Sequence, residues 1–192
     1  MKAILLTVIY SVNLMAAEPQ MNVAICNLGG LTEYVVSQAK SETDLVYRSA
    51  GVQIAWHDCE EFSDLASKPG APWFVIRLRN DKPPKTVGPA SLDVMGKAYV
   101  ENRGGYMADA YFQAIEDSAQ LYNGDPGVLL GFVIAHELGH LILGPGHAPD
   151  GVMQAAWGQK QIYALRQRWL TLSDKCGKRI RLALDARTKL AK

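Results

Sequence analysis

The stretch His136-Glu137-Leu-Gly-His140-Leu-Ile-Leu-Gly144-Pro-Gly-His147 holds three of the four histidines of the chain. His136 and His140 are four residues apart, so on a helix both imidazoles project from the same face, one turn apart. Two ring nitrogens can then reach one metal ion. Glu137 follows the first histidine and can approach a metal-bound water without binding the metal. The spacing therefore predicts a helix that carries two zinc ligands and a general base.

The residues after the helix predict a third ligand. Gly144 and Pro145 end the helix, because glycine accepts the left-handed conformation and proline cannot continue a helix. The chain can then fold back and bring His147 to the same metal. Three neutral imidazoles leave the fourth tetrahedral position to water, which is typical of a catalytic zinc site. Asp150 is the nearby alternative, since no glutamate follows Glu137.

This segment resembles the signature of the metzincin clan of zinc peptidases, HExxHxxGxxH followed by a methionine turn. The residues that match, in order, are His136, Glu137, His140, Gly144, His147 and Met153. One additional residue stands before the glycine, so the form here is HExxHxxxGxxH. The end of a helix can absorb one residue without loss of the ligand set. The resemblance implies one Zn²⁺ held by the three histidines, with Met153 as a hydrophobic floor beneath them.

Matrixins and archaemetzincins are the metzincins that this minimal chain resembles, and small secreted bacterial proteins of unassigned activity carry the same HExxHxxxGxxH form. The resemblance implies an α+β, zincin-like fold with an α/β-like N-terminal part. We expect a mixed, twisted sheet, an active-site helix and a small helical C-terminal subdomain. Residues 18–192 would form one catalytic domain, with an upper part to about residue 143 and the subdomain over residues 144–192.

Hydrophobic patterning predicts the elements around the motif. Strands are predicted over residues 21–26, 53–58, 73–79, 96–100 and 107–112. Helices are predicted over residues 31–50, from Asp125-Pro126-Gly127 to about Leu143, and after Ser173 or Asp174. The order strand, helix, strand at the start predicts a parallel pair with a right-handed crossover. The middle helix is apolar on nearly every side, so it must be buried, as a rigid ligand platform requires.

The segment Gly96-Lys-Ala-Tyr-Val100 stands where metzincins place the edge strand above the active-site cleft. By this resemblance, the backbone of Ala98, Tyr99 and Val100 would pair with an extended substrate by strand addition. The alternative is a simple edge strand without a ligand.

The N-terminal residues predict export. Met1 and Lys2 precede a short apolar run that ends in small residues at Ala17, which is the pattern of a secretory signal peptide over residues 1–17. The run is short for a membrane span, although an uncleaved anchor is the alternative. No later segment is expected to be long and apolar enough to span a bilayer. We therefore expect a protein that is secreted, extracellular or periplasmic, without stable membrane association.

Charge gives little reason to expect a nucleic-acid partner. Removal of residues 1–17 takes away one of the 20 Lys and Arg residues and none of the 19 Asp and Glu residues, which leaves a net charge of zero. Residues 159–192 contain 10 basic and 2 acidic residues, so this tail either packs on the acidic remainder or is solvated. A balanced total gives little long-range attraction, and no nucleic acid is expected as a partner.

Three cysteines are too few for a disulfide scaffold. Export would allow one bridge, for which Cys26 and Cys59 are the best-placed pair because both fall at ends of predicted strands. Cys176 would then remain a free thiol. Cys26 does not resemble the propeptide cysteine with which matrixins block their zinc, and we expect no long propeptide.

The predicted function is that of a secreted, monomeric zinc endopeptidase. Glu137 would take a proton from the zinc-activated water and pass it to the leaving amine of a peptide or protein substrate. A zinc hydrolase of a non-peptide amide or ester is one alternative. A non-catalytic zinc-containing binding module is the other, although such a module needs no base at Glu137. The fourth histidine, His57, is expected to be a strand residue without a metal role.

Overall fold

A computed structural model describes residues 18–62, 70, 72–83, 94–102 and 104–190. The predicted signal peptide, residues 1–17, lies outside the described residues. The strands are β1 (Gln20–Asn27), β2 (Gln53–Asp58), β3 (Trp73–Arg79), β4 (Gly96–Glu101) and β5 (Gly104–Tyr111). The helices are α1 (Glu33–Ser49), α3 (Phe112–Leu121), α4 (Pro126–Leu143), α5 (Gln159–Arg166) and α6 (Asp174–Leu190), with a 3-10 turn, η1 (Cys59–Glu61).

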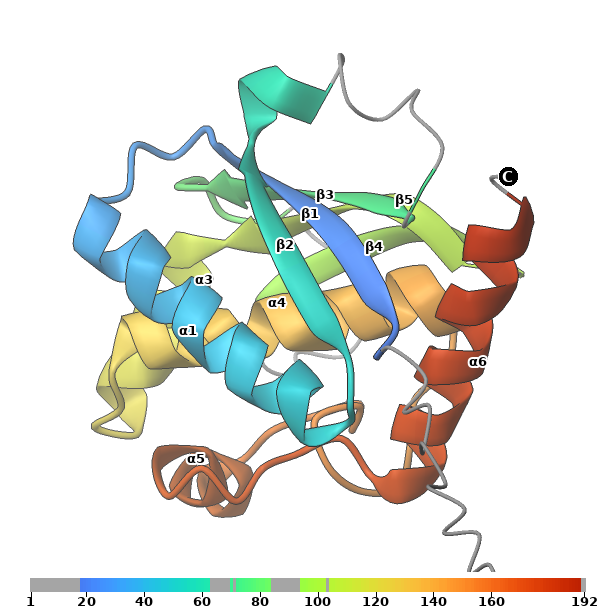
Figure 1. Cartoon of the computed structure of the whole chain (residues 1–192). Helices are drawn as coiled ribbons and strands as arrows, with labels where there is room; N and C mark the ends of the chain where they lie inside the picture. The colour runs from blue at the N-terminus through green and yellow to red at the C-terminus, as the bar shows by residue number, and fades with distance from the viewer. Residues whose placement is uncertain (1–17, 63–69, 71, 84–93, 103, 191–192) are drawn as a thin grey trace, which may run out of the picture.

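The five strands form one mixed sheet in the order β2-β1-β3-β5-β4. β1 pairs in parallel with β2 and β3, and β3 pairs in parallel with β5. β4 lies at the edge and runs antiparallel to β5. Figure 1 shows α1 and α4 side by side beneath this sheet, with α6 (red) across one end of α4. The predicted α+β fold with a mixed sheet is therefore confirmed.

α4 is the central helix of the molecule because it packs on the sheet, on α1 and on α6. It begins where predicted: Asp125 caps it by accepting a hydrogen bond from the Val128 backbone N–H at 2.9 Å, and Pro126 occupies the first helical turn. It ends at Gly144, whose φ of 87° a residue with a side chain rarely adopts. Both ends of α4, the helix that carries His136 and His140 and is called the metal-site helix below for the metal ligands predicted on it, are thus fixed by local sequence.

α4 also corrects one expectation about membranes. By length and composition alone it is apolar enough to cross a bilayer, with a mean hydropathy of 1.6. The prediction that no segment after residue 17 meets this criterion was therefore wrong. In the fold, 78% of the helix is buried inside the protein, which identifies it as a core helix.

Two helices were not predicted. The predicted strand over residues 107–112 ends one residue early, because Phe112 begins α3 instead. The chain passes from strand to helix at this point without a glycine or proline to mark the change. The buried residues Phe112, Ile115 and Ala119 do have helical spacing. α5 is only eight residues long, which is short for detection from periodicity.

The cysteines are arranged as expected. Cys26 at the end of β1 forms a disulfide with Cys59, which follows β2. The bridge ties the two parallel strands together at the ends where they leave the sheet. Cys176 is a buried free thiol in α6. Ser173 caps this helix, since its side chain accepts a hydrogen bond from the Cys176 backbone N–H.

Candidate metal centre

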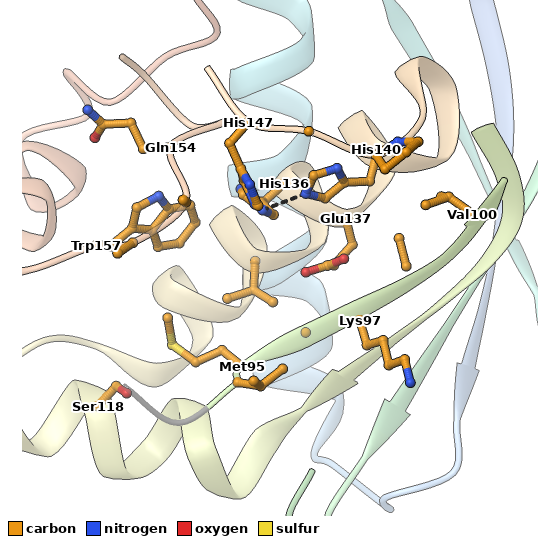
Figure 2. Close-up of a pocket in the computed structure, with 18 of the residues that line it drawn as sticks. Met95, Lys97, Val100, Ser118, His136, Glu137, His140, His147, Gln154 and Trp157 are labelled. Carbon is orange, nitrogen blue, oxygen red and sulfur yellow. Dashed lines mark hydrogen bonds between the residues drawn. The ribbon is translucent and has the colours of Figure 1, made fainter. Parts of the chain in front are cut away.

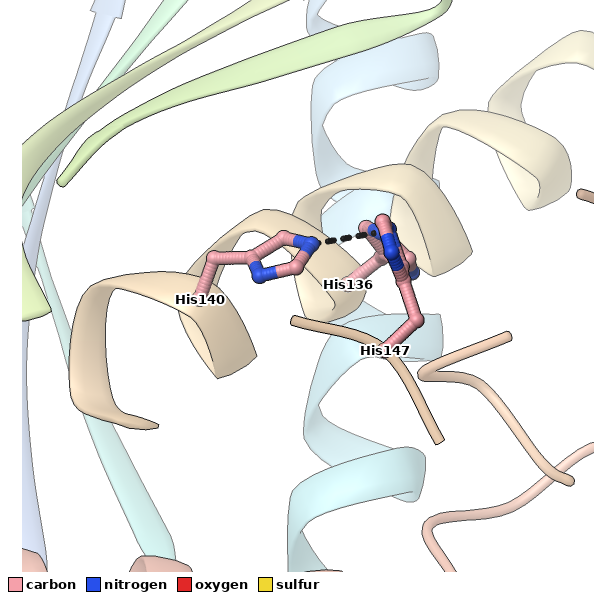
Figure 3. Close-up of side chains that lie close together, drawn as sticks. All are labelled: His136, His140 and His147. Carbon is pink, nitrogen blue, oxygen red and sulfur yellow. Dashed lines mark hydrogen bonds between the residues drawn. The ribbon is translucent and has the colours of Figure 1, made fainter. Parts of the chain in front are cut away.

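His136 and His140 project from the same face of α4, as their spacing predicted. Their Nε2 atoms lie 3.0 Å apart, and the two rings meet edge to face with centroids separated by 4.7 Å. Figure 3 shows the two rings converging on the space in front of the helix. Of the two, His140 is the more deeply buried, with 8% of its surface exposed.

His147 joins this pair from the chain that follows α4. The Gly144 turn reverses the chain direction, so that the His147 ring lies 4.8 Å from the His140 ring and 5.3 Å from the His136 ring. One ring nitrogen from each of the three histidines lies within 4.8 Å of the others (Figure 3). Asp150, the alternative third ligand, is not part of this group.

Backbone carbonyls orient the two helical histidines. The Nδ1–H of His136 donates to the Val152 carbonyl at 2.8 Å, and the Nδ1–H of His140 donates to the Gly144 carbonyl at 3.3 Å. The Nε2 atoms of His136 and His140 therefore carry no proton, and their lone pairs face each other. A cation bound by both lone pairs would stabilise this arrangement. Such carbonyl partners are typical of histidines that bind zinc. The donor set therefore fits a metal ion of the zinc type.

Burial favours the neutral, metal-binding form of the His136 and His140 imidazoles. It lowers the pKa of His136 to about 4, and the neighbouring His140 and His147 act in the same direction, while the Val152 carbonyl opposes them. Burial also lowers the pKa of His140. Neutral rings at physiological pH require no proton to be displaced before a metal binds.

Glu137 lies beside the three histidines, with 6% of its surface exposed. Burial raises the pKa of its carboxyl group to about 8, and a hydrogen bond from the Ala98 backbone N–H lowers it in part. The side chain also packs on the Cα atom of Gly96, where any Cβ atom would collide with the carboxylate. A cation held by the histidines would lower this pKa. The base predicted from the motif thus contacts the predicted edge strand directly.

Met153 is buried beneath the metal-site helix. Its sulfur lies against Gly139, where a Cβ atom would collide with it. The Met153 carbonyl accepts a hydrogen bond from the Ala148 backbone N–H at 2.8 Å, which closes the turn that follows His147. The preceding residue, Val152, holds His136 through its carbonyl. The methionine turn therefore supports the histidine group from below.

A cavity of about 470 Å³ opens in front of the histidines and Glu137. Figure 2 shows β4 along one side of it and the segment that carries Gln154 and Trp157 along the other. The indole ring of Trp157 stands perpendicular to His136 at a centroid distance of 5.6 Å. The backbone segment predicted to pair with substrate contributes Ala98 and Val100 to the lining.

Several residues of this site were not predicted from sequence. Gly96 shapes the position of Glu137, and Ser118 and Ile162 line the cavity from α3 and α5, the two helices that were missed. The helical spacing of the buried residues in α3 and α5 is the sequence signal from which these two helices could have been predicted. His57 lies elsewhere, in β2, where its ring nitrogens are 3.1 Å from Asn22 Oδ1 and 3.2 Å from a Glu61 oxygen.

The fold is that of the metzincin-type metallopeptidases. No sequence family and no curated protein matches the chain. Among solved structures, the chain is similar to archaemetzincin from Methanopyrus kandleri, with a TM-score of 0.53 and 17% identity over 90% of this chain and 99% of that one. It is also similar to metalloproteinase-II from Bacteroides fragilis, with a TM-score of 0.52 and 13% identity, over 88% of this chain and 54% of that one. Identities this low establish the fold alone.

Proposed function

We propose that this protein is a secreted, zinc-dependent endopeptidase in which His136, His140 and His147 hold the metal and Glu137 is the general base. The observation that carries the proposal is the buried Glu137 side chain, which lines the same cavity as the three histidines and accepts a hydrogen bond from Ala98 of β4, the edge strand of the described sheet. A structural metal site needs no such carboxylate, and a simple edge strand needs no metal beside it.

The metal and the residues around it would have separate roles in hydrolysis. A bound Zn²⁺ would supply Lewis acidity, which polarises a carbonyl and lowers the pKa of water. Glu137 would accept a proton from the attacking water and deliver it to the leaving nitrogen. The Ala98 N–H orients the Glu137 carboxylate, and burial excludes competing water. Met153 packs beneath the metal group and would keep its ligands fixed.

The edge strand β4 favours a polypeptide substrate over a small amide or ester substrate. In the described sheet, β4 pairs only with β5. Apart from the Ala98 N–H, which donates to Glu137, its other edge is available for strand addition above the cavity. We propose that Ala98, Tyr99 and Val100 bind an extended substrate backbone there. The similarity to solved metallopeptidase structures supports peptide or protein substrates.

We propose that the protein is exported, with residues 1–17 as its signal peptide. Residues 18–192 would form a single catalytic domain. The Cys26–Cys59 disulfide supports this proposal, because such bridges persist in oxidising compartments. We further propose that the enzyme acts as a monomer.

A digest of a denatured protein mixture tests the substrate class. The mature protein should generate new peptide N-termini, lose this activity with a chelator and regain it when Zn²⁺ is restored. Ester and small-amide substrates serve as the comparison. Hydrolysis of these substrates alone would favour the non-peptide hydrolase, and stoichiometric zinc without hydrolysis of any substrate would favour a binding module.

A further inference from the structure

Arg187, in the last turn of α6, reaches the C-terminal end of the metal-site helix. Its Nη2 group donates to the Leu141 carbonyl at 2.8 Å and to the Ile142 carbonyl at 3.5 Å. The last four carbonyls of a helix have no partner within it, and a cation at this end interacts favourably with the helix dipole. Arg187 therefore caps α4 immediately beyond His140.

The same guanidinium group binds the hairpin formed by β4 and β5. Its Nη1 group donates to the Gly105 carbonyl at 3.4 Å, and Gly105 is paired with Val100 of the edge strand. The guanidinium carbon also lies 5.3 Å from the centre of the Phe74 ring and 6.0 Å from that of Tyr106. One side chain thus connects α6, the end of α4 and the hairpin.

The hairpin and the end of α4 are in direct backbone contact around this side chain. A Cβ atom at Gly104 would collide with both the Leu141 carbonyl and Arg187, and one at Gly144 would lie 2.9 Å from the Asn102 carbonyl. A displacement of the hairpin therefore changes its distance from the helix that carries the histidines.

We propose that Arg187 is a positioning residue that sets the distance between the edge strand β4 and the three histidines, a proposal that rests on the peptidase function above. α4 has separate anchors to α1, where Thr43 and Tyr47 donate hydrogen bonds to its carbonyls. The pairing of β5 with β3 begins at Met107, so Gly105 and its partner Val100 lie beyond it. This end of the hairpin is therefore the part that shifts when Arg187 is lost. Binding of a long substrate along β4 would suffer, while the metal group would remain in place.

Arg181 provides a matched control on the same helix. It also donates a hydrogen bond to a backbone carbonyl, that of Ala50, but this carbonyl lies between α1 and β2. We would compare Arg187→Gln, Arg187→Lys and Arg181→Gln in the full-length mature protein. The readouts are zinc content, kcat and KM for a long peptide and for a dipeptide amide too short to pair along β4, and amide hydrogen exchange of Gly96–Glu101.

Arg187→Gln should raise KM for the long peptide roughly tenfold, the equivalent of one charge-assisted hydrogen bond. Its kcat, its zinc content and its kinetics with the short amide should stay close to those of the wild type. Exchange in β4 should become faster. Arg187→Lys should recover part of the effect, because it keeps the cation and loses the planar fork. Arg181→Gln should change none of these readouts.

Equal effects of Arg187→Gln and Arg181→Gln on both substrates would overturn the proposal, as would wild-type KM and exchange in Arg187→Gln. If Arg187→Gln does not fold, the test falls to Arg187→Lys: a wild-type KM and wild-type exchange of β4 in this variant would likewise overturn the proposal. If the wild type cleaves neither substrate, the peptidase function fails instead, and the exchange of β4 still decides whether Arg187 holds the hairpin.

Discussion

At Gly96, β4 passes so close to the Glu137 carboxylate that there is no room for a side chain. The two residues are far apart in sequence, and only the packing of the edge strand on α4 brings them together. The catalytic proposal therefore depends on a residue that has no functional group of its own.

Gly96→Ala should displace the Glu137 carboxylate and lower kcat/KM roughly tenfold to a hundredfold, since small misplacements of a catalytic group are costly. Zinc content should not change, because the three atoms nearest to a Cβ atom at this position all belong to Glu137 and not to a histidine. Gly158→Ala is the control, since a Cβ atom there has no neighbour closer than 3.9 Å. Steady-state kinetics and metal analysis of both variants check the prediction. Equal activity of the two variants would contradict it.

The raised pKa of Glu137 also makes the stability of the metal-free protein depend on pH. The folded state holds a proton on Glu137 up to a pKa of about 8, whereas the unfolded chain loses it near 4.5, so stability falls as the pH rises through this interval. His136 acts in the opposite sense, but only as the pH falls from 6.5 toward 4. Between pH 6.5 and 8 the loss attributable to Glu137 should be about 2 kcal/mol.

Urea unfolding of chelator-treated wild type and Glu137→Gln at pH 6.5 and 8 measures this loss. The variant lacks the titrating group and should show a much smaller change between the two pH values. An identical change in both proteins would show that Glu137 is not held protonated in the fold.

At the scale of elements, α1 supports the metal-site helix through hydroxyl groups rather than apolar contacts alone. Thr43 Oγ1 donates to the Gly131 carbonyl at 2.9 Å, and the Tyr47 hydroxyl donates to the Ala135 carbonyl at 3.1 Å. Both donors are buried. They fix α4 from the side opposite the cavity.

Tyr47→Phe should lower the free energy of unfolding by about 1 kcal/mol, because the hydrogen bond to α4 is lost while the ring still packs. Tyr34→Phe, on the same helix, changes a tyrosine that is 72% exposed and should have no measurable effect. Denaturant titrations of the two variants compare them directly. A loss of equal size in both would show that the hydroxyl of Tyr47 does not stabilise the fold.

Elements with local boundary residues were predicted well from sequence. Asp125 and Gly144 mark the ends of α4, and the histidine spacing placed two site residues on one face without tertiary information. α3 was missed because strand and helix join at Phe112 without a turn residue. The role of Gly96 could not be predicted, since it depends on a contact between distant segments.

The Cys26–Cys59 disulfide joins β1 to the turn that follows β2, on the side of the sheet remote from β4. The closed loop spans 33 residues. A cross-link of this length stabilises a fold by about 3–4 kcal/mol through restriction of the unfolded chain.

Reduction of the wild type should lower its urea midpoint, while a Cys26→Ala/Cys59→Ala variant should start at the lower value and not respond to reductant. Zinc content should be equal in all three samples below the transition, because the bridge contacts no histidine of the metal group. A response of the double variant to reductant, or loss of zinc on reduction, would contradict this assignment.

A paired measurement on the mature wild type and Glu137→Gln tests whether the protein is a zinc endopeptidase with Glu137 as its base. Each protein is analysed for bound metal and incubated with a denatured protein substrate. We expect one zinc ion in both proteins and cleavage by the wild type, with a loss of roughly a hundredfold or more in the variant. Absence of zinc from the wild type, or equal cleavage by the two proteins, would contradict this expectation.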